Sequence, residues 1–125
     1  MKKGSTMKLV QFGAGNIGRS FIGQLFSRAG WEVVFIDIDE KIIDALNQQR
    51  HYKVQVKDRE EHTITVANVR GVSGHQIDAV AEEVCNADIV ATAVGQKALS
   101  GIMKPLAAGL IKRNSRFPGK PLDII

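Results

Sequence analysis

The fold is decided by the stretch KLVQFGAGNIGR, residues 8–19. It begins with a short apolar run that stops at a cluster of glycines starting at Gly13. Apolar side chains then recur at helical spacing from Ile17 to Ala29, and Gly30 follows as a left-handed cap. This order predicts a strand, a tight turn and a helix, which is the first half of a β-α-β unit.

The same alternation continues along most of the chain. The continuous apolar run 33–36 predicts a strand buried on both faces, and Asp39 is expected to cap a helix that ends near Gln49. The remaining predicted elements are a helix over 76–85, a strand over 89–92, a helix ending near Lys112 and a strand over 122–125. We therefore predict an α/β, Rossmann-like doubly wound fold with a mostly parallel sheet of about five strands.

One segment interrupts this alternation. Tyr52, Val54 and Val56 alternate with polar residues, and a polar turn follows at 58–61. Residues 63–66 and 69–72 are again strand-like. The pattern predicts an antiparallel hairpin or a small meander inserted in the parallel sheet.

Length and composition predict one soluble globular domain. The chain has 125 residues, of which 44% are hydrophobic and 24% charged, as in folded proteins. A second methionine, Met7, directly precedes the first strand, so we expect residues 1–6 to be a disordered leader or an expression remnant and residues 7–125 to form the domain. The predicted last strand has nothing after it, which indicates truncation before a C-terminal catalytic domain.

The composition also argues against several classes of function. The net charge of +4 comes from mostly scattered lysines and arginines without interleaved aromatics, so nucleic-acid binding is not expected. No apolar run approaches the ~20 residues that span a bilayer, so no membrane partner is expected. The single cysteine, Cys85, is interpreted as a small buried hydrophobe, which fits a cytoplasmic protein. His51, His62 and His75 match no zinc spacing, so no metal site is predicted.

The glycine cluster has the spacing G-x-G-x-x-G of a dinucleotide-binding turn. Gly13 permits the tight turn, Gly15 lets backbone amides approach a pyrophosphate, and Gly18 lets the helix pack on the strand. The amides at the helix N-terminus then face the phosphates. A tight turn without a ligand is the alternative for a bare match. The predicted phosphate-binding residues are Gly13, Ala14, Gly15, Asn16, Ile17, Gly18 and Arg19, although Arg19 could equally stay solvated.

A carboxylate stands where the ribose of the dinucleotide would lie. Asp37 follows the second predicted strand, 19 residues after Gly18, and a carboxylate there accepts hydrogen bonds from ribose hydroxyls. The same charge repels a 2′-phosphate, which favours NAD over NADP. The alternative is a strand-end or helix-capping aspartate, and Asp39 competes for either role.

A third segment lies at the carboxyl end of a later predicted strand, where open α/β sheets bind their ligands. It consists of Thr92, Ala93, Val94 and Gly95. Small residues there would let the backbone approach the nicotinamide side of a dinucleotide. A simple strand-to-helix turn is the alternative interpretation.

At this point the chain resembles a known family. The run QFGAGNIGR, residues 11–19, followed by FIG at 21–23, resembles the start of the mannitol-1-phosphate 5-dehydrogenases, a group of the polyol-specific long-chain dehydrogenases. The resemblance covers nearly everything after Met7, in the segments FID (35–37), DALN (44–47), YKV (52–54), TAVG (92–95), GLIKR (109–113) and PLDII (121–125). Ser20 and Trp31 depart from the family pattern without bearing on the substrate.

The resemblance implies NAD as cofactor, no metal, and reversible hydride transfer between mannitol 1-phosphate and fructose 6-phosphate. Members of the family join such a domain to a larger, mainly helical C-terminal domain that carries a catalytic lysine with asparagine and histidine partners. The sugar phosphate is expected to bind through that domain. No catalytic residue is assigned in this chain, which should have no turnover alone. Relatives that act on mannitol, altronate or fructuronate share the scaffold, and the oligomeric state stays open.

Two rival classes remain. The first is an NAD(H)-sensing regulatory module of the kind that controls potassium transport, which has a similar length, glycine turn and acidic strand end. Ligand-dependent changes of assembly would support it. The second is a basic nucleic-acid-binding domain, for which affinity would fall steeply with added salt.

Overall fold

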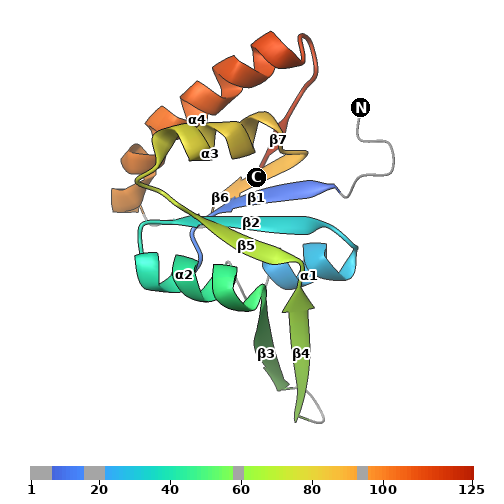
Figure 1. Ribbon diagram of the computed structural model, residues 1–125. Helices are drawn as coiled ribbons and strands as arrows, with labels where there is room; N and C mark the ends of the chain where they lie inside the picture. Colours follow the sequence, from blue (N-terminus) through green and yellow to red (C-terminus); the bar gives the residue numbers. More distant parts are fainter. Residues whose placement is uncertain (1–6, 16–21, 58–60, 93–95) are drawn as a thin grey trace.

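The computed structural model describes residues 7–15, 22–57, 61–92 and 96–125 (Figure 1). Its centre is a five-stranded sheet in which every pairing is parallel and the strand order is β5-β2-β1-β6-β7. The strands are β1 (Lys8–Phe12), β2 (Glu32–Asp37), β5 (Val69–Ser73), β6 (Ile89–Thr92) and β7 (Asp123–Ile124). The predicted Rossmann-like sheet of about five parallel strands is confirmed.

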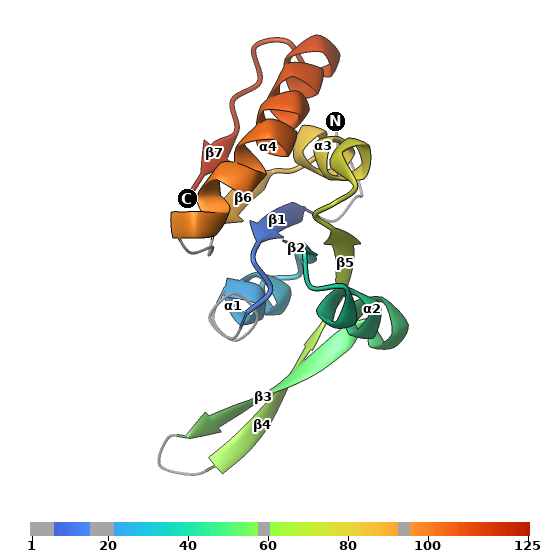
Figure 2. The same cartoon turned by 90° about the vertical axis from the view of Figure 1, so that its left-hand side faces the viewer.

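Helices cover both faces of this sheet. Figures 1 and 2 show one pair of helices below the sheet and the other pair above it. The lower pair is α1 (Gly23–Arg28) and α2 (Glu40–Gln49), and the upper pair is α3 (Ile77–Cys85) and α4 (Gln96–Arg116). Among the residues that the structure describes, none of these helices is long and apolar enough to cross a membrane.

The alternation of side chains along each strand builds two cores. On the α1 and α2 side, Leu9, Phe35 and Val69 are fully buried. On the α3 and α4 side, Val10 and Val34 belong to a second buried cluster. Because successive residues of a strand point to opposite faces, both faces of β1 and β2 need apolar residues. The continuous apolar runs of the sequence have this cause.

The inserted segment is a hairpin and not a meander. Strands β3 (His51–Lys57) and β4 (Glu61–Ala67) form a separate antiparallel pair that extends away from the main sheet (Figure 2). After Asn68, whose φ is 59°, the chain enters β5, which pairs in parallel with β2. The meander alternative is wrong because an apolar strand pattern shows which face is buried and does not show which neighbour the strand pairs with.

The predicted helix ends are largely confirmed. Gly30 has φ 88°, and Asp39 caps α2 by accepting a hydrogen bond from the amide of Lys41 at 3.1 Å. The last helix is longer than expected, since α4 ends at Arg116 and not near Lys112. The guanidinium of buried Arg113 donates to carbonyls at the end of α3 and beyond it, so tertiary contacts hold the additional turn.

Candidate functional site

The strand order places a switch point beside β1. From β1 the chain adds β2 and β5 on one side, whereas β6 and β7 lie on the other side. Phe12, near the end of β1, is in register with Ile36 of β2 and with Thr92 of β6. The carboxyl ends of three neighbouring strands therefore meet at one edge, where open α/β sheets bind ligands.

The described part of the glycine turn has open space beside it. Gly13 has φ 96°, which favours glycine, and its amide donates to the carbonyl of Ile36 at 2.7 Å. The side chain of Ala14 is buried against the sheet. Gly15 is exposed, and a Cβ built on it would meet no atom of the described residues within 4 Å. The described part of the turn thus lies against β2 and leaves space for a ligand beside Gly15.

Asp37 holds this turn in place. One carboxylate oxygen accepts a hydrogen bond from the amide of Ala14 at 2.8 Å, and the other accepts from the amide of Asp39 at 2.9 Å. The backbone carbonyl of Asp37 accepts from the amide of Gly74 at 2.9 Å. A carboxylate has about four lone-pair sites, so both oxygens can accept further bonds. The two aspartates have different places, since Asp39 caps α2 and Asp37 contacts the turn.

Several predicted residues lie outside the described part of the chain. These are Asn16, Ile17, Gly18 and Arg19 of the turn and Ala93, Val94 and Gly95 after β6. Thr92 is described and exposed, with its amide donating to the carbonyl of Ile125 at 2.9 Å. The structure therefore brings Gly13, Ala14, Asp37 and Thr92 to one edge.

Residues beside Asp37 that sequence reasoning did not single out also belong to this edge. Ser73, which is in register with Asp37, donates from its hydroxyl to the carboxylate of Glu40 at 2.5 Å. Ile38 is 65% exposed although it is a large apolar residue, and its side chain lies against Gly74. The pairing of β5 with β2 brings these groups together, and no local sequence motif predicts that pairing.

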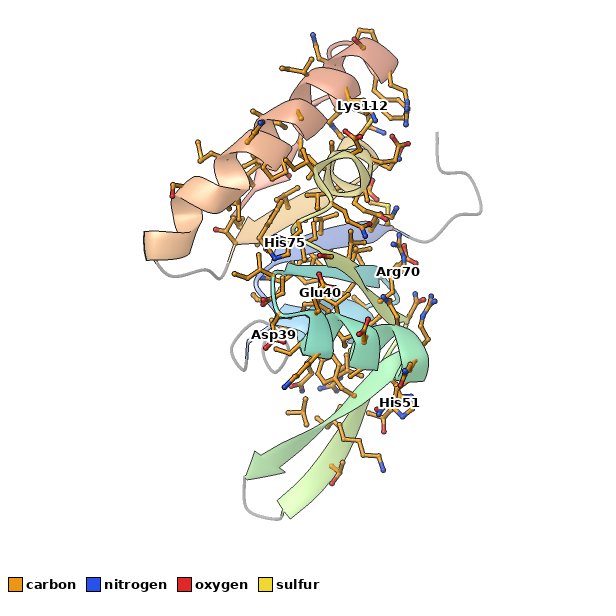
Figure 3. All side chains as sticks on the ribbon, turned by 60° about the vertical axis from the view of Figure 1, so that its left-hand side comes forward. Asp39, Glu40, His51, Arg70, His75 and Lys112 are labelled. Carbon is orange, nitrogen blue, oxygen red and sulfur yellow. The ribbon has the colours of Figure 1, made fainter. Side chains whose placement is uncertain are left out.

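The two histidines whose side chains are described lie apart from each other. Figure 3 shows His75 near Asp39 and Glu40 at one end of the sheet, whereas His51 lies beyond the other end of α2. Within residues 7–15, 22–57, 61–92 and 96–125, no group of three or more histidine, cysteine, aspartate or glutamate side chains could hold a metal ion. Cys85 is buried, as the sequence predicted.

Comparison with known families agrees with this geometry. A family model described as the mannitol dehydrogenase Rossmann domain matches residues 7–125. The chain belongs to this family. A mannitol dehydrogenase Rossmann domain is the nucleotide-binding part of a dehydrogenase, so the fold implies a nucleotide cofactor. The family match favours the dehydrogenase interpretation over a regulatory nucleotide sensor or a nucleic-acid-binding domain.

Individual relatives are similar over nearly the whole chain. The mannitol-1-phosphate 5-dehydrogenase of Shouchella clausii is 51% identical, in an alignment that covers 95% of this chain and 31% of the relative. The proteins of the same name from Halalkalibacterium halodurans and Brevibacillus brevis are 44% and 42% identical, again over 95% of this chain and 31% of their own length. The chain therefore spans about a third of the curated relatives that it matches.

Proposed function

We propose that residues 7–125 form the NAD-binding domain of an oxidoreductase that interconverts mannitol 1-phosphate and fructose 6-phosphate. The observation that carries the proposal is the bond between the Asp37 carboxylate and the amide of Ala14. It supports the proposal because a carboxylate that could accept from ribose hydroxyls lies directly beside the glycine turn, where no described atom comes within 4 Å of a Cβ on Gly15. This is the arrangement that a dinucleotide requires at the first β-α turn.

The turn residues 13–19 would hold the pyrophosphate. The space beside Gly15 admits a phosphate close to the backbone, and the amides of the turn and of the helix that follows it would donate to its oxygens. Arg19 would add a cation. The exposed side chain of Ile38 would offer an apolar surface for the adenine base next to the ribose.

The charge at this edge favours NAD over NADP. Asp37 ends β2, Asp39 caps α2, and Glu40 follows in the first turn of that helix. A 2′-phosphate on the ribose would meet these carboxylates, and among the described residues no arginine or lysine side chain forms an ion pair with any of them. Repulsion by like charges without compensating cations disfavours the phosphate.

The remaining proposed contacts serve the nicotinamide half. Thr92 is the last residue of β6, across the switch point from the turn, and Ala93, Val94 and Gly95 come next in the sequence. NAD supplies the hydride acceptor of the reaction. The sugar phosphate and the groups that move its proton would belong to the C-terminal domain, because the relatives are about three times as long as this chain. We propose that residues 1–6 are a leader. We also propose that the chain alone has no turnover, and NADH oxidation with fructose 6-phosphate would contradict this second proposal.

A binding titration tests the cofactor assignment. Trp31 is the only tryptophan and packs edge-on against Phe26 of α1. Energy transfer from its emission to bound reduced nicotinamide would report binding. We expect saturable quenching by NADH and little by NADPH, and loss of that preference in Asp37→Ala. Asp39→Ala is the comparison variant, since it removes a helix cap and one of the three carboxylates, and it should weaken the preference less than Asp37→Ala does. Equal binding of both nucleotides by the unaltered chain would contradict the proposal.

A further inference from the structure

Two segments far apart in the sequence meet at the base of the hairpin. A Cβ on Gly23, the first residue of α1, would collide with the hydroxyl oxygen of Tyr52 in β3 and lie 3.0 Å from Cζ of Phe35. The rings of Tyr52 and Phe35 pack edge to face with centroids 6.0 Å apart. Gly23 is buried in this contact. Helix α1 and the hairpin therefore approach each other at a distance that only glycine permits.

The second strand of the hairpin also holds α1. The hydroxyl of Ser27 donates to the carbonyl of Ala67, at the end of β4, at 2.7 Å. Val66, next to it, is buried in the core beneath the helix. Figure 1 shows that end of β4 next to α1. Both strands of the hairpin base thus brace the same helix.

Helix α1 depends on tertiary packing. Its described part, Gly23–Arg28, packs on Phe35 and Tyr52 through Gly23 and bonds to Ala67 through Ser27. In proteins most helical stability comes from such packing and not from helix propensity. The position of α1 therefore depends on the surfaces that it packs against, and the hairpin base is one of them.

The same contact reaches the glycine turn through β2. The described anchors of the turn are the amides of Gly13 and Ala14, which donate to Ile36 and Asp37 of that strand. Phe35, whose ring packs against that of Tyr52, comes directly before Ile36 and Asp37 in β2. We propose that Tyr52, packed against Gly23, is a positioning residue that sets α1 and the glycine turn in the geometry for the cofactor, an inference that rests on the proposed function.

The first test needs no nucleotide. In Gly23→Ala we expect the amides of Gly13 and Ala14 to exchange with solvent about fivefold faster or more, measured against the slowest core amides of the same variant, because overpacking displaces α1. Gly109→Ala is the matched control. It overpacks another helix contact, with Val84 2.5 Å from the new Cβ, on the opposite face of the sheet. It should destabilise the domain and leave the relative exchange of the turn unchanged.

Rescue identifies the contact responsible. Adding Tyr52→Phe to Gly23→Ala removes the colliding oxygen and keeps the ring, so most of the protection of the turn should return. Should Gly23→Ala not fold, Tyr52→Ala removes the brace instead and should give the same faster exchange. Unchanged exchange in both variants would overturn the inference.

The second readout is affinity for NADH. We expect Gly23→Ala to raise the dissociation constant by about fivefold or more, Tyr52→Phe to reverse this, and Gly109→Ala to leave it unchanged. Faster exchange without any loss of affinity would overturn the positioning role. If the unaltered chain does not bind NADH, the proposed function fails, while the exchange data still decide whether Tyr52 positions the turn.

Discussion

The two ends of the parallel sheet satisfy their polar groups in different ways. At the amino end, Arg70 forms a bidentate salt bridge with Glu83, with N–O distances of 2.6 and 2.8 Å. Lys8 contacts the same carboxylate at 3.0 Å, and Arg70 reaches Glu32 at 3.3 Å. These side chains are only 15–24% exposed. The charges of these four described side chains neutralise one another.

The carboxyl end is organised in the opposite way. Both oxygens of Asp37 accept bonds from backbone amides, Gly15 faces open space, and Ile38 is 65% exposed. Figure 3 shows Asp39 and Glu40 at this end and Arg70 at the other. The amino end is expected to contribute to stability, whereas the carboxyl end has the acceptors and the apolar surface that we propose for the cofactor. Changes at the two ends should therefore separate stability from binding.

The largest effect is expected at the carboxyl end, from Gly15→Val. A Cβ at this position meets no described atom within 4 Å, and the added side chain would occupy the space proposed for the pyrophosphate. We expect NADH affinity to fall by about 100-fold or more, since a clash of about 3 kcal/mol corresponds to that factor. Gly101→Val on α4 is the matched control, because a Cβ there also meets open space. Equal affinity of both variants would show that the space at Gly15 is not used.

At the amino end, Arg70→Met should have the reverse profile. It leaves the carboxylates of Glu83 and Glu32 without their main partner. We expect the free energy of unfolding in urea to fall by about 2 kcal/mol, less than for a fully buried pair because solvent screens the network. NADH affinity of the folded protein should not change. A large loss of affinity would mean that the two ends are coupled.

The amino end should also make stability depend on pH. Burial alone would raise the pKa of Glu83, but hydrogen bonds from Arg70 and Lys8 outweigh it and hold the pKa below the usual 4.5. A lowered pKa in the folded state stabilises the protein above the unfolded value, and that contribution is lost as the pH falls through the folded pKa. Urea titrations between neutral pH and pH ~3 should show less loss on acidification for Glu83→Gln than for the unaltered chain.

The smallest effect is expected from the neighbouring residue on α3. Hydrogen bonds from Arg116 and Lys112 lower the pKa of Glu82 to about 2, yet this carboxylate lies in solvent. Exposed ion pairs contribute little because water and salt screen them. Glu82→Gln should leave the urea midpoint within experimental error, and added salt should have no larger effect on the unaltered chain than on the variant. A clear destabilisation would show that the difference in exposure between Glu82 and Glu83 does not determine how much each contributes to stability.

Local elements could be predicted because their signals are local. The glycine turn, the cap at Asp39 and the left-handed Gly30 each depend on a few adjacent residues. The placement of β5 could not be predicted, since its pairing with β2 joins residues 36 positions apart, such as Val33 and Val69. The contact between Gly23 and Tyr52 could not be predicted from the sequence for the same reason, although both residues lie in segments that resemble the family.

The sequence by itself determined the class of the fold, the position of the glycine turn and the acidic end of the second strand, because spacing and periodicity act within one or two elements. Only the tertiary structure decided which strands pair, that Asp37 bonds to Ala14, and that the charges of Arg70 and Glu83 meet. These contacts join residues distant in the chain, and packing of the whole domain brings them together.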